Sequence, residues 1–426
     1  MPTLESLERE NSQLRRAVEE LSVLNELSAA IGASRGMEDI IQTIIRRSIK
    51  AVRAEQGVVT LVGEDSTDPT KTLVRTMASS SDKTAYSPDQ NLLGWMHLNR
   101  KPLVINDPPS DRRFQGVKWP ESIRSIVAAP MLVHSRLTGI LTLYNKKHSD
   151  GFSMEDQRLL SILAGQSGQV VENARLSEEE KKLVTMQQEL LFANEIQMNL
   201  LPGVAPPVDN YELAGISIPA QDVGGDYYDY IPIDNGRIAI TVGDVSGKGL
   251  PAALMMSNVQ ATLRGQAQFG VSVHETIERS NHLLTQSVRK GTFVTLFYGV
   301  LDPAEHTIHY SNAGHNRPYI LRDNDELETL TLGDLVLGFV GTQTYREEVT
   351  TLDVGQFLFI FSDGVTEAMN SAHDQFDESR LEPLLISLKE SSAQEIIDAV
   401  GKAIRKHAAG YPQNDDITML CLKRLK

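Results

Sequence analysis

The sequence has a single cysteine, Cys421, among its 426 residues, which allows no internal disulfide and no multi-cysteine metal site. Long hydrophobic runs are also missing. The longest stretch without charged or strongly polar side chains is IVAAPMLV (126–133), far short of the roughly 20 apolar residues that a membrane-spanning helix needs. The first residues, MPTLESLERENSQ, lack the basic-then-apolar pattern of a signal peptide. Together these absences predict a cytoplasmic protein without a membrane partner.

Basic residues are scarce as well, because 41 Lys and Arg face 56 Asp and Glu, for a net charge of −15. Affinity for a nucleic-acid backbone comes mostly from Lys and Arg, which release counterions from the phosphates. We therefore expect no nucleic-acid partner. Hydrophobic residues make up 41% and charged residues 23% of the chain, which is ordinary for globular domains and argues against extensive disorder. At about 100–200 residues per domain, the length suggests two or three domains.

The first 24 residues have the spacing of a helical heptad repeat. The positions of its seam alternate steps of three and four residues: Leu4, Leu7, Asn11, Leu14, Val18, Leu21 and Asn25. Leucine at d with asparagine at a favours two parallel strands in fixed register. The pattern predicts a coiled coil over residues 1–24 and a parallel homodimer, with an amphipathic helix packed on its own domain as the alternative.

Residues 25–175 follow an α/β pattern. A helical stretch over 37–54 precedes a strand over 56–63, and two strands over 125–133 and 138–146 lead into a helix from about 153. This order, with the ending GILTLYNK…F..ED, resembles a GAF sensor domain. Four positions approximate a signature of cyclic-nucleotide-binding GAF domains, in which the Lys–Asp pair is thought to be structural: Asn145, Lys146, Phe152 and Asp156.

The ligand of this GAF-like domain stays open. A covalently attached bilin needs a cysteine in the domain, and Cys421 lies at the far end of the chain. Haem needs an axial ligand, and His97 and His134 are isolated histidines, which are more often surface or core residues. The domain can bind a small molecule, a protein or nothing.

A helical connector over 176–205 separates this domain from the rest. Its helix continues to about residue 200, where LPGVAPP ends it, because proline cannot continue a helix and glycine permits the turn. Residues 206–426 alternate short strands with long helical runs, which predicts a layered α+β domain. The strands are expected over 237–245, 292–302, 307–314, 356–364 and 416–422, and the helices over 250–268, 272–290 and 391–409.

Acidic residues stand at the ends of the expected strands of this last domain. Asp226, Asp244 and Asp363 each lie beside glycine, and the pair Asp415–Asp416 introduces the last strand. Any one Gly-Asp pair is usually a turn. Several carboxylates that point into one place repel each other unless a cation neutralises them, and hard divalent cations prefer all-oxygen sites. Because no histidine or cysteine spacing suits zinc, the pattern predicts a Mg²⁺ or Mn²⁺ site.

Two other interpretations of the glycine-rich segments are rejected. VGGDYYDY (223–230) lacks the acidic and aromatic residues that follow Gly-Gly-Asp in cyclic-dinucleotide synthases. GDVSGKG (243–249) has three residues between its first glycine and Gly-Lys, and glycine where a phosphate-binding P-loop has Ser or Thr.

Six ordered motifs identify the last domain by resemblance. VGGDYYDY, VGDVSGKGLPAALMM, FVTLFYGVLD, SNAGHNRPYIL, FSDGVTEAMN and NDDITML are similar to the motifs of PPM-type (protein phosphatase 2C-like) serine/threonine phosphatases, and most similar to their SpoIIE-like branch. The resemblance covers about residues 190–426. It implies an α-β-β-α sandwich with two Mn²⁺ or Mg²⁺ ions at one end.

The resemblance also implies a set of ligands. Asp244 resembles the carboxylate that bridges both ions, with the Val245 carbonyl as a neighbouring ligand. Asp363 and Asp415 resemble ligands of one ion, and Asp226 resembles a ligand reached directly or through water. Asp416, next to Asp415, is the less certain neighbour.

The implied chemistry needs no protein nucleophile. Two ions roughly 3.5–4 Å apart lower the pKa of a shared water from about 15.7 to near neutrality, so that it attacks phosphorus in line. Cys421 lies within an expected strand and is better interpreted as a small core residue. The arginine that holds phosphate in animal-type relatives is missing from GISIPAQDV, and the candidates for that role are Gly247 and Lys248.

The sequence as a whole therefore predicts a signal-controlled protein-serine/threonine phosphatase. Its substrate, by family resemblance, is a small phosphoprotein of the anti-sigma-factor antagonist type. The alternative is a catalytically silent, ligand-sensing dimeric scaffold with a PPM-like domain.

Overall fold

The computed structural model describes residue 11 and residues 36–62, 73–78, 86, 90–148, 151–287 and 291–426. The chain divides into two compact units, Met1–Thr185 and Met186–Lys426. Apart from Asn11, the coiled coil expected over residues 1–24 lies outside the described residues. Within the described ranges, no helix is both long enough and apolar enough to cross a membrane.

The first unit contains one antiparallel sheet of five strands in the order β2-β1-β5-β4-β3. Its elements are α2 (Met37–Val52), β1 (Ala54–Leu61), β2 (Leu73–Ala78), α3 (Gln90–Asn99), β3 (Leu103–Ile105), two short 3-10 helices (Pro108–Ser110 and Arg112–Phe114), β4 (Ile126–Val133), β5 (Arg136–Lys146) and the beginning of α4 (Met154–Leu200). Helix α2 buries isoleucines spaced three and four residues apart, which form one apolar stripe. That stripe packs on Val59, Leu141 and Leu143 of the sheet.

Lys146 and Asp156 form the structural pair that the GAF-like signature predicts. Lys146 Nζ lies 2.6 Å from Asp156 Oδ1 and donates a second hydrogen bond, 2.9 Å long, to the Val52 carbonyl. The pair therefore joins the end of β5 to the end of α2 and to the first turn of α4. The Lys146 ammonium therefore has a structural role, because both of its hydrogen bonds join neighbouring elements of the domain.

The second unit is built from ten strands and five helices of the described chain after α4. They are β6 (Tyr211–Ile218), β7 (Tyr227–Pro232), a 3-10 turn (Asp234–Gly236), β8 (Ile238–Val245), α5 (Leu250–Ala267), α6 (Val273–Ser287), β9 (Val294–Asp302), β10 (Thr307–Ala313), β11 (Tyr319–Leu321), β12 (Leu327–Thr329), β13 (Glu348–Thr351), β14 (Phe357–Phe361), α7 (Asp363–Thr366), α8 (Glu378–Ser387), α9 (Ala393–Ala408) and β15 (Ile417–Arg424). The long strands and helices match the expected ranges to within a few residues, except β14, which ends before Asp363.

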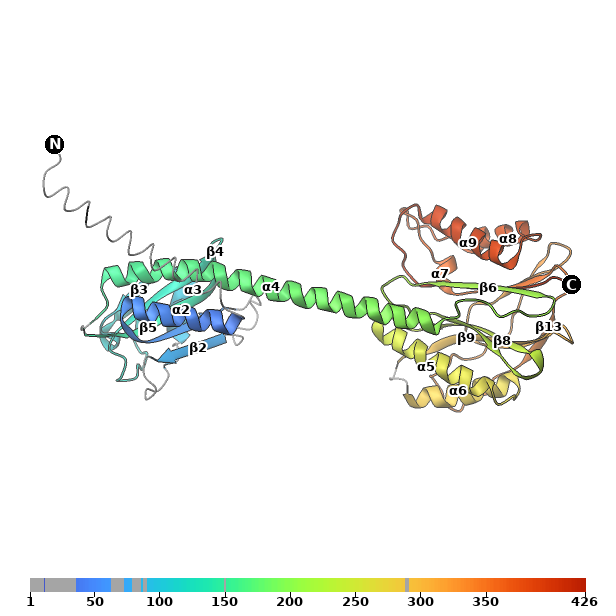
Figure 1. Ribbon diagram of the computed structural model, residues 1–426, viewed down its shortest axis with the longest axis horizontal. Coiled ribbons are helices and arrows are strands. Elements are labelled where there is room, and N and C mark those ends of the chain that lie inside the picture. Colours follow the sequence, from blue (N-terminus) through green and yellow to red (C-terminus); the bar gives the residue numbers. More distant parts are fainter. Residues whose placement is uncertain are drawn as a thin grey trace, which may run out of the picture. The chain divides into compact units, whose positions relative to one another are not determined.

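Within this unit, two five-stranded sheets face each other and helices cover their outer faces. The sheet β13-β10-β9-β8-β7 carries α5 and α6, and the sheet β12-β11-β14-β15-β6 carries α8 and α9 (Figure 1). Buried side chains of both sheets, among them Ile240, Phe297, Leu358 and Leu420, share one hydrophobic core. The α-β-β-α sandwich predicted for this part of the chain is confirmed.

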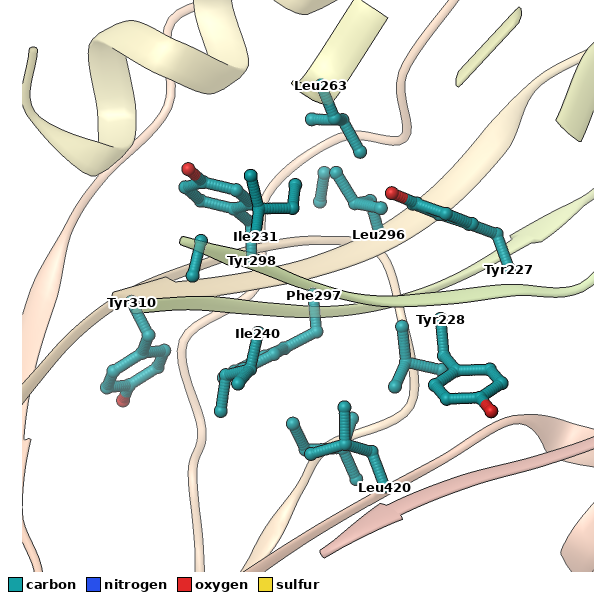
Figure 2. Close-up of a cluster of buried hydrophobic side chains, with 14 of the residues drawn as sticks. Tyr227, Tyr228, Ile231, Ile240, Leu263, Leu296, Phe297, Tyr298, Tyr310 and Leu420 are labelled. Atoms are coloured by element: carbon teal, nitrogen blue, oxygen red, sulfur yellow. The ribbon is translucent and has the colours of Figure 1, made fainter. Parts of the chain in front are cut away.

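Successive side chains of a strand in the first sheet point alternately to the helices on its outer face and to the second sheet, as in any pleated strand. Tyr227 and Ile231 of β7 point toward Leu263 of α5, whereas Tyr228 points toward Leu420 of the second sheet (Figure 2). Cys421 is buried within β15, and burial raises the pKa of its thiol. The expectation that Cys421 is a core residue is therefore confirmed.

Candidate metal centre

Asp226 and Asp244 both face the space between the two sheets. Asp226 precedes β7 and, two residues from Tyr228, shares the face of that strand that points to the second sheet (Figure 2). Asp244 is the next-to-last residue of β8 and shares its face with Ile240, which also points to the second sheet. Asp226 is only 3% exposed, and its Oδ2 atom has no hydrogen-bond partner among the described residues.

Asp363 and Asp415 come from the second sheet. Strand β14 ends at Phe361 and pairs with Met419 near the beginning of β15, so the residues after β14 and before β15 leave the sheet at the same end. A Cβ atom placed on Gly364 would lie 3.2 Å from the Asp415 carbonyl oxygen and 2.0 Å from that of Asp416. Glycine at position 364 is therefore required for the two acidic segments to touch.

The acidic segments of the two sheets meet at Gly225. A Cβ atom there would lie 2.8 Å from the Val245 carbonyl oxygen and 3.6 Å from Asp244 Oδ1. The Gly225 amide also donates a 2.6 Å hydrogen bond to Asp416 Oδ2. The four acidic motifs, up to about 190 residues apart in the chain, thus converge on one end of the sandwich.

Asp416 uses its carboxylate to hold the Gly-Gly-Asp turn. Its Oδ1 accepts the Ala220 amide at 2.7 Å, and its Oδ2 accepts the amides of Gly225 at 2.6 Å and Asp226 at 3.3 Å. Both oxygens are therefore engaged by the backbone around the turn. The assignment of Asp416 as a metal ligand remains a prediction, and its visible contribution is to place Asp226.

Burial and mutual repulsion raise the pKa values of three of these carboxyl groups. Burial, followed by the charges of Asp363, Asp415 and Asp416, raises the pKa of Asp244 to about 7. Burial, with the nearby Asp244, raises the pKa of Asp226 well above its ordinary value, and burial with the nearby Asp415 raises that of Asp363. A set of acids in this state gains most from a cation that neutralises it.

Lys248 supplies one positive charge at the edge of the set. Its ammonium donates to Asp415 Oδ2 at 2.9 Å and to the Asn414 carbonyl. The pKa of Lys248 is raised, first by the hydrogen bond to Asp415. Gly247, the other residue predicted to hold phosphate, adopts a φ of +98° and is exposed.

The last turns of α4 bind the same Gly-Gly-Asp segment, which sequence reasoning missed. Gln197 donates to the Gly224 carbonyl at 2.6 Å and accepts the Gly224 amide at 3.0 Å, and Asn194 donates to the Asp222 carbonyl at 2.5 Å. In the sequence, Asn194 and Gln197 look like ordinary solvent-facing residues of a helix, so no local pattern indicates that they bind this segment. Gln197 is nevertheless buried.

The donor set fits a hard divalent cation. It offers carboxylate oxygens, the Val245 carbonyl beside Asp244, and a buried Asp226 oxygen without a partner, all of them oxygen ligands of the kind that Mg²⁺ and Mn²⁺ prefer. Across the described ranges, no three His, Cys, Asp or Glu side chains form a ready-made metal site. Carboxylates that repel one another are expected to stay apart unless a cation lies between them.

The sandwich with an acidic centre at one end defines the class of the protein, and comparisons with known proteins agree. Residues 234–425 match the family model described as stage II sporulation protein E (SpoIIE), and residues 34–172 match that of the GAF domain. The phosphatase part is similar in fold to the SiaA-PP2C domain of Pseudomonas aeruginosa, with a TM-score of 0.51 and 20% identity over 57% of this chain and 98% of that one.

Two relatives in Bacillus subtilis are named as phosphoserine phosphatases. The chain is 30% identical to RsbU, over 55% of this chain and 70% of RsbU, and 26% identical to RsbP, over 43% of this chain and 47% of RsbP. The chain belongs to the SpoIIE-type family of PPM protein phosphatases and carries an N-terminal GAF domain. It is a protein phosphatase.

Proposed function

We propose that this chain is a Mn²⁺- or Mg²⁺-dependent serine/threonine phosphatase that is regulated through its GAF domain. Its substrate is a phosphoserine or phosphothreonine on a signalling protein of the anti-sigma-factor antagonist type. The observation that carries the proposal is the convergence of the four acidic motifs on one end of the sandwich. The names of RsbU and RsbP as phosphoserine phosphatases support the substrate class.

In this proposal each residue has a distinct role. Two ions, when bound, supply an activated water for in-line attack on phosphorus and offset charge on the phosphoryl oxygens. Asp244 would contact both ions, Asp363 and Asp415 would hold one of them, and Asp226, whose buried Oδ2 has no partner among the described residues, would be a ligand directly or through water. The Val245 carbonyl completes the set from the end of β8.

The function is tested by following dephosphorylation of candidate phosphoproteins across a range of Mn²⁺ concentrations. We expect turnover that rises with Mn²⁺ and is abolished by a chelator. The silent-scaffold alternative predicts no turnover at any Mn²⁺ concentration, either with a phosphoprotein or with para-nitrophenyl phosphate. Such a result would overturn the proposed chemistry.

Lys248 is proposed to bind the substrate phosphate once the ions have taken Asp415. The Lys248 ammonium pairs with the Asp415 carboxylate, so an incoming ion has to displace it from that ligand. The Lys248→Met variant is therefore expected to bind the first Mn²⁺ more tightly, by a few fold, while KM for para-nitrophenyl phosphate rises. Calorimetric titration and steady-state kinetics measure the two effects. An unchanged KM would show that Lys248 does not bind phosphate, and Lys402→Met, at an exposed position of α9, is the matched control.

We also propose that α4 carries the regulatory signal to the metal centre. The helix runs from Met154 to Leu200, and its Gln197 side chain holds both backbone groups of Gly224, two residues before Asp226. A ligand of the GAF domain can shift activity only if it binds the active arrangement more tightly.

Gln197→Ala is expected to weaken Mn²⁺ binding and lower turnover by about 10–100-fold, as removal of residues that orient ligands typically does. Gln188→Ala, exposed on the same helix, should leave both unchanged. Deletion of residues 1–175 tests the coupling itself, because unchanged activity and metal affinity would show that the GAF domain does not control the site.

The parallel homodimer remains a proposal that the surface of α4 supports. Val184, Leu191 and Met198 are exposed by 46%, 65% and 42% and recur every seven residues, the spacing of a coiled-coil seam. We expect the full chain to run as a dimer in light scattering and the triple glutamate variant of these positions to run as a monomer. Val354→Glu, at a loop position 56% exposed, should remain dimeric, and a monomeric wild type would refute the dimer.

A further inference from the structure

His315 is a buried histidine that the proposed chemistry leaves unexplained. It follows β10 in the motif SNAGHNRP and is 5% exposed. The Asn312 side chain clamps its backbone, accepting the His315 amide at 2.7 Å and donating to its carbonyl at 3.1 Å. Asn312 is itself buried. The clamp fixes the turn that carries the imidazole into the protein.

One side of the imidazole contacts the strand next to Asp244. His315 Nδ1 lies 2.9 Å from Thr295 Oγ1. Thr295 is on β9 and is the direct register partner of Asp244 on β8. Directly opposed residues of antiparallel strands share a face and have Cβ atoms about 4.5–5.5 Å apart. The Thr295 side chain is therefore the neighbour of the Asp244 carboxylate.

The other side of the imidazole faces the second sheet. Nε2 has no hydrogen-bond partner among the described residues. Burial lowers the pKa of His315 to about 4, and the backbone carbonyl of Phe361 partly offsets this effect. Phe361 ends β14, two residues before Asp363. The ring thus lies between the strand beside Asp244 and the strand that leads to Asp363.

A neutral imidazole has one hydrogen-bond donor and one acceptor, so its Nδ1 can accept a hydrogen bond from the Thr295 hydroxyl. If the Thr295 hydroxyl donates to Nδ1, the proton is on Nε2, the nitrogen without a hydrogen-bond partner among the described residues. A protonated ring would have two donors and would place a positive charge behind the carboxylates. Burial keeps the ring in the neutral form at physiological pH.

We propose that His315 is a positioning residue of the carboxylate site, a strut that holds Thr295 against Asp244 and spans to Phe361, and so sets the separation of Asp244 and Asp363. The inference rests on the proposed two-metal function, because the separation matters only if both carboxylates bind the same pair of ions. Residues behind metal ligands orient them, and their loss typically weakens metal binding about 10–100-fold.

A double-mutant cycle on the full chain tests the strut. Thr295→Val removes the hydroxyl at nearly constant shape, and His315→Phe keeps the ring without its nitrogens. Each is expected to weaken Mg²⁺ binding in calorimetry about tenfold, and the double variant no further, because both break one connection. His282→Phe, on the exposed side of α6, should bind as the wild type does.

The outcomes separate the strut from the function on which it rests. If the wild type binds no divalent ion, the two-metal function fails and the strut with it. If the wild type binds Mg²⁺ and both variants bind within twofold of it, or their effects multiply, the strut alone is overturned. Should His315→Phe not fold, His315→Asn, which keeps a group near the position of Nδ1, replaces it, with an expected affinity closer to the wild type.

A spectroscopic signature completes the test, since a merely structural histidine would not report on the ions. In ¹H–¹⁵N spectra of histidine-labelled protein, the resonance lost in His315→Asn is expected to be neutral with its proton on Nε2 from pH 6 to pH 8. It should shift when Mg²⁺ is added to the wild type and stay unchanged in Asp244→Asn. A ring that titrates near pH 6.5, or one that does not respond to Mg²⁺, would contradict the proposal.

Discussion

Replacing Asp244 with asparagine is expected to reduce phosphatase turnover by about a thousandfold or more. Removing one preorganised group that stabilises transition-state charge costs about 10²–10³ in rate, and Asp244 is proposed to contact both ions, which places its loss at the upper end. The substitution keeps the size of the side chain and removes its charge. We expect kcat to fall at saturating substrate and the Mn²⁺ affinity measured by calorimetry to fall with it.

The same variant should be no less stable than the wild type when ions are absent. Burial and the surrounding acids raise the pKa of Asp244 to about 7, so the ionised carboxylate is disfavoured in the folded, metal-free site. Asparagine removes that repulsion. Thermal unfolding in a chelator therefore distinguishes loss of chemistry from loss of fold.

Asp222→Asn is the matched control, because it makes the same chemical change at an exposed side chain in the loop between β6 and β7. It should retain wild-type turnover and Mn²⁺ affinity. If Asp244→Asn keeps more than a tenth of the activity, Asp244 does not bridge the ions.

Replacing Arg264 with alanine is expected to lower the free energy of unfolding by about 2–4 kcal/mol, because it leaves a buried carboxylate without its cation while water can partly replace the half-exposed guanidinium. Arg264, on α5, holds Asp229, on β7, through two hydrogen bonds of 2.6 and 2.9 Å. The Asp229 side chain is fully buried, while that of Arg264 is about half exposed. Without the guanidinium, the partners left to Asp229 within the described part of the chain are the Tyr227 hydroxyl and the Tyr230 amide.

Chemical denaturation of the metal-free protein measures this loss, which should appear in the transition of the second unit. Arg279→Ala is the control, since Arg279 and Glu275 form a pair on α6 whose side chains are 43% and 42% exposed, and such pairs contribute about 0.3–0.5 kcal/mol. Arg264→Lys should fall between the two, because lysine cannot reproduce the two parallel bonds. A loss below 1 kcal/mol in Arg264→Ala would show that Asp229 finds another partner.

The ion pair also matters for the site, because it fixes α5 against β7. Helix α5 begins directly after GDVSGKG, and β7 begins directly after Asp226. The helix therefore directly follows the second acidic motif, and the strand directly follows Asp226 of the first. We therefore expect Arg264→Ala to lower the affinity for Mn²⁺ as well as the free energy of unfolding.

Much of this architecture could be predicted from the sequence, because the signals are local. The short apolar runs in RIAITVGDV and FLFIF mark the strands, and the glycines beside Asp244 and Asp363 mark where each run gives way to a turn or helix. The order of the six motifs was enough to predict the PPM sandwich, which the fold confirms. The connector helix and its end at LPGVAPP also followed from proline and glycine alone.

Other features depended on tertiary structure, since they join residues that lie far apart in the chain. Asp415 and Asp416 look alike in the sequence, yet Asp416 turns toward the amides of Gly225 and Asp226, whereas Asp415 pairs with Lys248. From the sequence, Gln197 is expected to be a solvent-exposed helix residue, but in the structure it is buried and hydrogen-bonded to Gly224. Strands β6 and β7 were not anticipated, because their short, mixed segments carry little periodicity of their own.

The sequence by itself determined the class of the protein, because its acidic motifs stand at the ends of apolar strand runs in a fixed order along the chain. Only the tertiary structure decided which partners each of these carboxylates has, and so which role each can take. A side chain's role depends on which lone pairs and amides lie within hydrogen-bond distance, and that is set by the packing of two sheets whose facing segments are up to about 190 residues apart. His315 is the clearest case, since in the sequence it is an isolated histidine and in the fold it lies between Thr295, the register partner of Asp244, and the end of β14, which leads to Asp363.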